Sequence, residues 1–247
     1  MPENIGDELP HALNVLWGRA EPKGRGRTPA LSLERIVAAA VALADEEGLA
    51  ALSMARLAER LGCAPMSLYR HVAGKDDLQL FMLAAAPGPP PEFGTAPADW
   101  RGSLTRWAVE LLGVYLRHPW IVQLVNSPPV DPGQLAWLDA ALRTLGGTPL
   151  DPRTRFSVVM LVLHYVRGAA QLLTSMTTAE PEERADEAYA ALLAELADPG
   201  RFPALARAVE AGVFAPHPGA GPDDDFRAGL DHLLDGVGMA IERAARA

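Results

Sequence analysis

The apolar positions in the first third of the chain recur with the 3.6-residue spacing of amphipathic helices. A short piece of this kind, LPHALNVLWG, comes first and is followed by a basic arm rich in Gly and Pro, RAEPKGRGRTPA. Ser32 then can cap a helix whose apolar stripe ends near Gly48. Ser53 can cap a second, shorter helix, and Gly62 would turn the chain after it.

The next residues predict two more helices of this first unit. Pro65 is typical of a helix start, and the third helix is expected to run to about Val72. Gly74 breaks it, and KDDLQLFMLAAA begins a fourth helix. The segment PGPPPEFGTAP at 87–97 cannot be regular helix, so it marks a domain boundary.

Beyond that boundary every periodic segment is helical, and no segment predicts a strand. The expected helices cover 99–117, 119–126, 131–145, 151–177, 181–196, 202–212 and 224–246. The fold class is therefore all-α, with a three-helix head before a larger helical body. The predicted divisions are an N-terminal extension at 1–31, a helix-turn-helix unit at 32–79, a connecting helix and Pro-rich linker at 80–98, and a body at 99–247.

Composition agrees with this pattern, and charge divides the chain. Of the 247 residues 49% are hydrophobic and only 6% aromatic, which favours helices over sheets. The formal net charge is −9, yet residues 18–75 hold nine Lys/Arg against six acids, a balance of +3. From Phe81 onward thirteen Arg face twenty Asp/Glu, a balance of −7. A basic end on an acidic body suits a protein that binds a polyanion with one end only.

The cysteine count and the apolar runs indicate a cytoplasmic protein. Cys63 is the single cysteine, so no internal disulfide forms; it is interpreted as a small apolar filler, with redox sensing as the alternative. The most apolar run, VVMLVLHYV at 158–166, is too short to cross a bilayer, and no membrane partner is expected.

Residues 53–72 have the build of a helix-turn-helix. Ala58 is small enough for two helices to approach closely, and Leu57, Leu61 and Leu68 can fix their relative angle. In such a unit the second helix enters the major groove while neighbouring groups hold phosphates. Because helix pairs with a Gly turn are also common outside DNA-binding proteins, geometry leaves two interpretations open. The first is a DNA-binding helix-turn-helix, and the second is an ordinary helix pair of a globular protein.

The order of residues favours the first interpretation. LERIVAAAVALADEEGLAALSMARLAERLGCAPMSLYRHVAGKDDL closely resembles the DNA-binding domain of the TetR family of transcriptional repressors. More loosely, DWRGSLTRWAVELLGVYLRHPW, the helix at 151–177 and FRAGLDHLLDGVGMAIE resemble the C-terminal domain of the tetracycline-repressor subclass. The resemblance implies a homodimer that reads a near-palindromic operator, with half-sites about 34–36 Å apart. It also implies that a small molecule bound in the body releases the dimer from the DNA.

The same resemblance assigns DNA contacts. Ser53 matches a helix cap that holds a phosphate, Arg70 is the candidate for reading guanine, and Ala55 stands where the tetracycline repressor has a base-reading Arg. The other positions matched to the groove or the phosphates are Pro65, Met66, Ser67, Tyr69, His71 and Lys75. A solvated Arg70 and a buried, structural His71 are the alternatives.

The arm before the first helix carries a further candidate group. Lys23, Arg25 and Arg27 are separated by glycines, so they can enter the minor groove or lie along phosphates. The alternative is a solubilising tail with no DNA contact.

In the body the resemblance implies an effector pocket, and the departures from the subclass pattern predict an apolar or aromatic effector with no metal or other cofactor. His118 and His164 match a metal-ligating His of the subclass and a neighbouring one, but Leu172 replaces the companion carboxylate. Candidate contacts are Trp107, Tyr115, His118, Trp120, Trp137, Met160, His164 and Tyr165. For each of these, a place in the plain core is the alternative.

The last helix and the long helix before it are implied to form the dimer interface. On the last helix one apolar face is predicted for this role, namely Phe226, Leu230, Leu233, Leu234, Val237 and Ile241. The sequence has no nucleophile elbow, phosphate loop, CxxC pair or HExxH, so an enzyme or a small-molecule carrier is the weaker alternative. A DNA-binding activator without an effector is the other.

Overall fold

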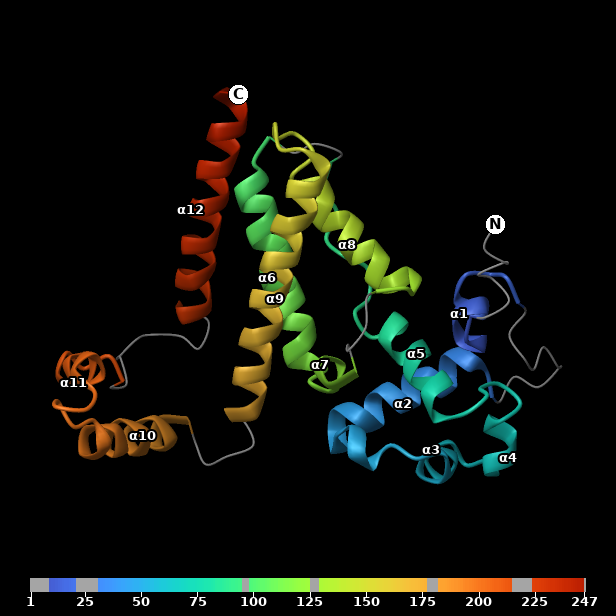
Figure 1. Cartoon of the computed structure of the whole chain (residues 1–247). Coiled ribbons are helices and arrows are strands. Elements are labelled where there is room, and N and C mark those ends of the chain that lie inside the picture. Colours follow the sequence, from blue (N-terminus) through green and yellow to red (C-terminus); the bar gives the residue numbers. More distant parts are fainter. Residues whose placement is uncertain are drawn as a thin grey trace.

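The computed structural model describes residues 9–20, 31–94, 98–124, 129–176, 182–214 and 224–246. Helices are the only regular elements within these ranges, which confirms the all-α prediction. Figure 1 shows a small N-terminal head beside a body of long, upright helices.

The head begins as the sequence pattern predicts. Its helices are α2 (Leu33–Glu47), α3 (Met54–Leu61) and α4 (Pro65–Leu68), with a single 3-10 turn at Leu49–Ala51. Ser32 and Ser53 are both N-caps: each hydroxyl accepts the backbone N–H three residues later, at 3.2 Å. Gly62 ends α3 with a φ of +65°, a left-handed conformation that favours glycine.

The third helix is shorter than predicted, and this part of the prediction was wrong. It ends at Leu68, and residues 69–71 form a turn in which the backbone N–H of His71 bonds to the Leu68 carbonyl at 2.8 Å. The tighter turn carries Val72 into the core, where it and Leu68 are fully buried. Helical spacing alone does not reveal such a change, because Val72 also suits the buried face of a longer helix.

Two helices join the head to the body. α5 (Lys75–Ala85) leads out of the head, and α1 (His11–Leu16) lies against it. The buried Asp77 carboxylate holds α1 in place: it accepts the Ala12 N–H at 2.6 Å and lies 3.1 Å from the His11 ring. Asp77 also accepts the Ala73 N–H at 2.8 Å, so one side chain ties α1 to the loop before α5.

The body is built around two long helices that pack side by side. The helices packed around them include α7 (Trp120–Leu124), α8 (Pro132–Thr144) and α12 (Asp224–Arg246), and the two long helices are α6 (Trp100–Arg117) and α9 (Pro152–Met176). α6 packs on α9, and both also contact α8 (Figure 1). Asp99 caps α6 and Asp131 caps α8 through their carboxylates.

α9 as a whole is long and apolar enough to cross a membrane, although the apolar run at 158–166 is by itself too short. Its Val159, Val162 and Val166 are fully buried among the other body helices. A core helix of a soluble protein passes the same length test, so α9 is weak evidence for a membrane span.

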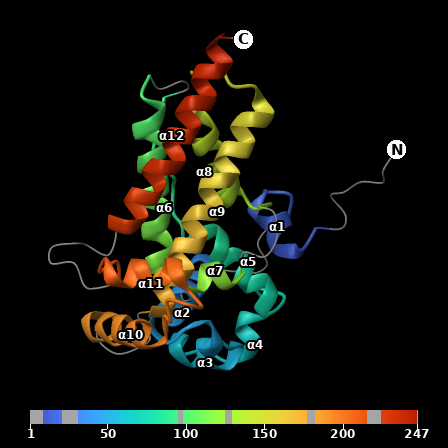
Figure 2. The same cartoon turned by 60° about the vertical axis from the view of Figure 1, so that its left-hand side comes forward.

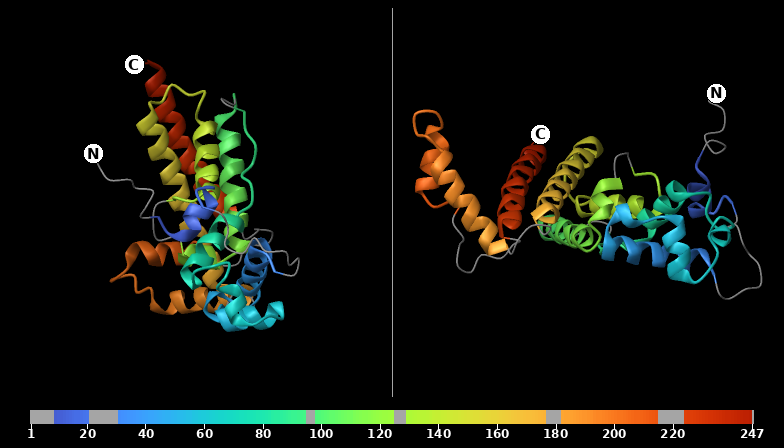
Figure 3. Two further views of the ribbon diagram at one scale, coloured as in Figure 1. Left: turned by 90° about the vertical axis from the view of Figure 1, so that its right-hand side faces the viewer. Right: turned by 90° about the horizontal axis from the view of Figure 1, so that it is seen from below.

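α10 (Glu182–Leu196) and α11 (Pro203–Glu210) contact each other and project away from the upright body helices (Figure 1 and Figure 3, right), and in Figure 2 they lie below α12 and α6. Tyr189, Leu192 and Leu196 are about half exposed along α10. These two helices take no part in the pocket described below.

The apolar face of α12 packs on its own chain, whereas the dimer prediction requires it to face a second copy. Phe226, Leu230, Leu234 and Val237 are buried within their own chain, where α12 packs on α9. Phe226 stacks on Tyr165 with ring centroids 5.3 Å apart. Leu233 and Ile241 are half-buried. The predicted interface residues are therefore mainly core, because α12 needs one apolar face to pack on its own body.

Candidate nucleic-acid interface and effector pocket

The predicted recognition helix presents its first residues to solvent. Met66 is 70% exposed and Tyr69 44% exposed, although both are large side chains. Pro65 and Arg70 are also exposed, and Ser67 is half-buried. Leu68, on the opposite face, is fully buried against α3. The helix is thus fixed by one face and free to contact a partner with the other.

The basic residues of the head divide into paired and unpaired groups. Arg56 is ion-paired with Glu47, and both Arg60 amino groups bond to Glu46 at 2.6 and 2.7 Å. Arg70 and Lys75 have no ion-pair partner within the described ranges. The exposed charges that stay available therefore flank the end of the recognition helix and the start of α5.

The other predicted DNA contacts are His71, Ser53 and the three basic residues of the arm. His71 is buried, with only 9% of its surface exposed, so its placement agrees with the structural alternative. The Ser53 hydroxyl is exposed but already accepts the Arg56 N–H as a helix cap. The arm residues Lys23, Arg25 and Arg27 lie outside the described part of the chain.

A narrow pocket opens among α5, α6, α7, α8 and α9 of the body. It measures about 50 Å³, below the roughly 300–1,000 Å³ of sites for drug-sized ligands. Three predicted effector contacts, Trp107, Tyr115 and Trp137, line it. The remaining lining residues are Leu83, Pro87, Leu111, Ile121, Pro129, Gln134, Leu138, Leu163 and Arg167.

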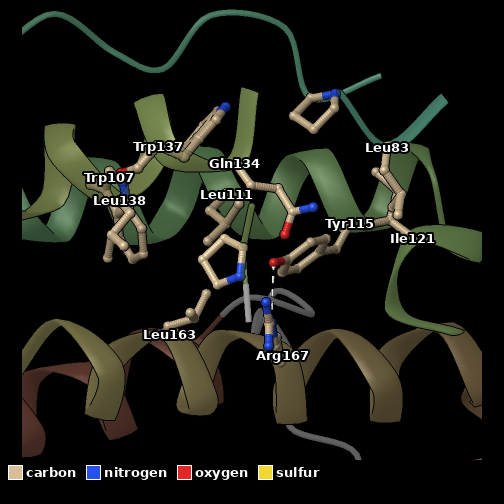
Figure 4. Close-up of a pocket in the computed structure, with 12 residues that line it drawn as sticks. Leu83, Trp107, Leu111, Tyr115, Ile121, Gln134, Trp137, Leu138, Leu163 and Arg167 are labelled. Atoms are coloured by element: carbon tan, nitrogen blue, oxygen red, sulfur yellow. Dashed lines mark hydrogen bonds between the residues drawn. The ribbon is translucent and has the colours of Figure 1, made fainter. Parts of the chain in front are cut away.

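The two ends of this pocket differ in their polar groups. The indole N–H of Trp107 donates to the Trp137 carbonyl at 2.9 Å, and that of Trp137 to the Gly88 carbonyl at 3.1 Å. Both indoles are therefore already satisfied. At the other end Arg167 reaches up from α9 toward the Tyr115 hydroxyl, with Gln134 beside them (Figure 4).

The other five predicted effector contacts do not line the pocket. The His118 Nδ1 lies 2.8 Å from the Asp45 carboxylate of α2, and the Trp120 indole N–H donates to the same oxygen at 2.7 Å. His164 is exposed, and Met160 packs against the core. His118 and Trp120 thus join the body to the head instead of facing the pocket.

Tyr165 is also placed away from the pocket, on the α12 side of α9. Its hydroxyl donates to the Phe226 carbonyl at 3.0 Å. Burial, with a smaller effect of Asp225, raises the pKa of Tyr165, so the neutral phenol remains the donor over a wide pH range.

The described residues contain no cluster of three or more His, Cys, Asp or Glu that could hold a metal ion. His118 is engaged by Asp45, and Leu172, at the position of the missing carboxylate, is 66% exposed. Among the described residues, His118 and the position of the missing carboxylate therefore have other surroundings than a shared metal site.

Family models match both parts of the chain. Residues 36–80 match the model described as bacterial regulatory proteins of the tetR family, and residues 93–241 match the tetracyclin repressor-like C-terminal domain. The chain belongs to the TetR family of DNA-binding transcriptional repressors. The resemblance inferred from the sequence is thereby confirmed, and this family is a class of regulators and not of enzymes.

Curated relatives and solved structures agree with this TetR assignment. The HTH-type transcriptional repressor DrrR1 of Streptomyces coeruleorubidus is 34% identical over 95% of this chain and 87% of its own. An HTH-type transcriptional regulator of Saccharopolyspora erythraea is 34% identical over 64% of this chain and 67% of its own. The TetR family protein ActR of Streptomyces coelicolor, solved with actinorhodin, shares the fold with a TM-score of 0.74 at 22% identity, over 87% of this chain and 98% of ActR.

Sequence reasoning missed several residues of these sites. Asp45 gave no signal, because a helix-terminal acid is ordinarily solvated. Arg167 did leave one: it is the single charge in the stretch VVMLVLHYVRGAAQLL, where a cation needs a reason to be buried. Leu83 and Ile121 could not be assigned, since they reach the pocket from helices distant in sequence.

Proposed function

We propose that this TetR-family protein is a repressor that binds a near-palindromic operator as a homodimer and is released by a small molecule in the body pocket. The observation that carries the DNA-binding part is the exposed end of the recognition helix. There Arg70 and Lys75 lack ion-pair partners within the described residues, whereas Arg56 and Arg60 are paired with glutamates. Unpaired cations next to a helix that can enter the major groove suit contacts to bases and phosphates.

The dimer would use the faces of α9 and α12 that their own chain leaves uncovered. On α9, Leu161 is 46% and Leu172 66% exposed, and on α12, Met239 is 62% exposed. Other exposed residues lie at helical spacing on the same two helices: His164 and Gly168 on α9, and His232 and Gly236 on α12. No other side chain or backbone fills the space beside either of these glycines, so helices of a second copy can approach closely.

Release would follow from the size and walls of the pocket. Because the pocket is much smaller than the usual sites of drug-sized ligands, a ligand of that size would have to push the walls apart. Leu83 belongs to α5, which leads into the head, and Ile121 follows directly on the His118–Trp120 segment that bonds to Asp45 of α2. Widening the pocket would therefore shift the head at two points.

DNA from upstream of the protein's own gene tests the first part in a gel-shift series at rising salt. We expect a complex of two protomers per site that weakens steeply with salt, and no comparable complex on a scrambled fragment of equal length. Equal binding to both fragments, or none at low salt, would contradict a sequence-specific regulator.

Filling the pocket tests release without any effector. Leu138→Trp should hold the pocket open and lower operator affinity by about 5–150-fold, the usual range of allosteric coupling. Leu196→Trp, on the exposed face of α10, is the matched control and should leave affinity unchanged. If L138W folds and binds the operator as tightly as wild type, pocket and head are not coupled.

A further inference from the structure

We propose that the ligand of the body pocket is an aromatic molecule with an acidic group, and that Arg167 pairs with that group. This inference rests on the proposed role of the pocket as the effector site. It adds the charge of the ligand.

Among the described residues that line the pocket, Arg167 is the only charged one. It is half-buried on α9, and no carboxylate pairs with it within the described ranges. Its one hydrogen bond joins Nε to the Tyr115 hydroxyl at 3.4 Å, longer than the usual 2.7–3.2 Å. Since a guanidinium stays charged at any physiological pH, this side chain retains donors for an anion.

The rest of the pocket suits a flat apolar body. Trp107 and Trp137 form one end, with ring centroids 6.3 Å apart, and their N–H groups are already bonded to carbonyls. They therefore offer ring surface and no free donor. Figure 4 shows Arg167 and Tyr115 at the other end, so a ligand would place its rings by the tryptophans and its acidic group by Arg167.

Cationic ligands fit this arrangement poorly. No Asp or Glu of the described part of the chain lines the pocket, and the Asp131 carboxylate is engaged by the backbone and side chain of Gln134. A positive ligand would meet Arg167 in a poorly hydrated site, where like charges repel strongly. A neutral ligand would leave the guanidinium without the partner that its burial calls for.

Two probes of nearly equal shape test the charge. 2-Naphthoate carries a carboxylate and 2-naphthamide a neutral amide on the same rings, and calorimetry measures the binding of each to the full-length protein. Wild type should bind naphthoate about tenfold more tightly, the order expected for a charge-assisted pair. Arg167→Met should abolish this preference by weakening naphthoate alone, and Arg167→Lys should keep part of it.

Arg153→Met is the matched control, because Arg153 is exposed at the start of the same helix. It should retain the wild-type preference. Equal affinity of wild type for both probes, binding of neither, or equal weakening of both in R167M would overturn the proposal. If R167M does not fold, the wild-type ratio and R167K still decide. Failure of the repressor function would appear separately, as missing operator binding with probe selectivity intact.

Discussion

The head and the body each hold an arginine with no carboxylate partner among the described residues, and the two have opposite surroundings. Arg70 is exposed at the end of the recognition helix, in water, with Lys75 close by in sequence. Arg167 is half-buried beside aromatic rings. Water and salt screen the first charge strongly and the second much less.

This difference separates two kinds of anion recognition in one chain. Exposed cations bind a polyanion through the sum of several weak, salt-dependent contacts, which suits the proposed pairing of two heads on an extended DNA. A single half-buried cation can select one acidic group, because less solvent competes with it. The acidic body and the basic head of the sequence are thus suited to different partners.

The largest effect should come from separating the two copies. Leu161→Asp combined with Met239→Asp places charges on the exposed faces of α9 and α12, so we expect a monomer by light scattering. Operator affinity should fall by about 100-fold or more, since one head keeps only half of the contacts. Naphthoate binding should persist if the pocket lies within one protomer.

Val130→Asp is the control, because Val130 is 48% exposed on a loop away from these helix faces. It should remain dimeric. A double variant that stays dimeric would show that other surfaces form the interface.

The next effect distinguishes base reading from phosphate binding within the head. Arg70→Ala should cost about 1–3 kcal/mol on the operator and relax specificity at one base pair. Lys75→Ala should weaken all sequences about equally and reduce the salt slope by about one. Binding to a library of single-base operator variants at several salt concentrations measures both.

Arg56→Ala provides the contrast, since Arg56 is already paired with Glu47. Its effect should be smaller than that of either unpaired cation. A loss of affinity as large as that of R70A would contradict the division into paired and unpaired groups.

A comparable effect, on stability instead of DNA binding, should follow from cutting the link between the head and the body. Asp45→Ala removes the acceptor of both His118 and Trp120, and we expect the free energy of unfolding to fall by about 1–3 kcal/mol. Urea unfolding measures this loss. Asp139→Ala, which removes an exposed ion pair with Arg143, should change stability by less than about 0.5 kcal/mol.

The smallest effect concerns the paired surface cations of the head. The Arg60 guanidinium lowers the pKa of the exposed Glu46 carboxylate below its usual value. The pair therefore stabilises the fold at pH values above that usual pKa, and the contribution is lost as acid protonates Glu46. Thermal melts of Arg60→Gln and wild type should differ slightly at neutral pH and converge in acid. A gap that persists in acid would rule out the ion pair as its cause.

The sequence by itself determined the helices, their caps and the family. Ser32, Ser53 and Gly62 act where the pattern placed them, because a cap or a left-handed glycine depends only on neighbours in the chain. The order of residues in the head was specific enough to identify a TetR-type motif. These features are local, so one sequence suffices to recognise them.

Only the tertiary structure decided which faces are covered and which charges meet. Phe226 and Leu230 lie on an apolar stripe that suits either a partner or the chain's own core. They are buried in the core because α12 packs on α9. His118 was expected at the pocket, but Asp45, 73 residues earlier, holds it at the head. Arg167 faces the pocket because α9 is fixed by its contacts with α6. Helical spacing defines a face, but only long-range packing determines what that face contacts.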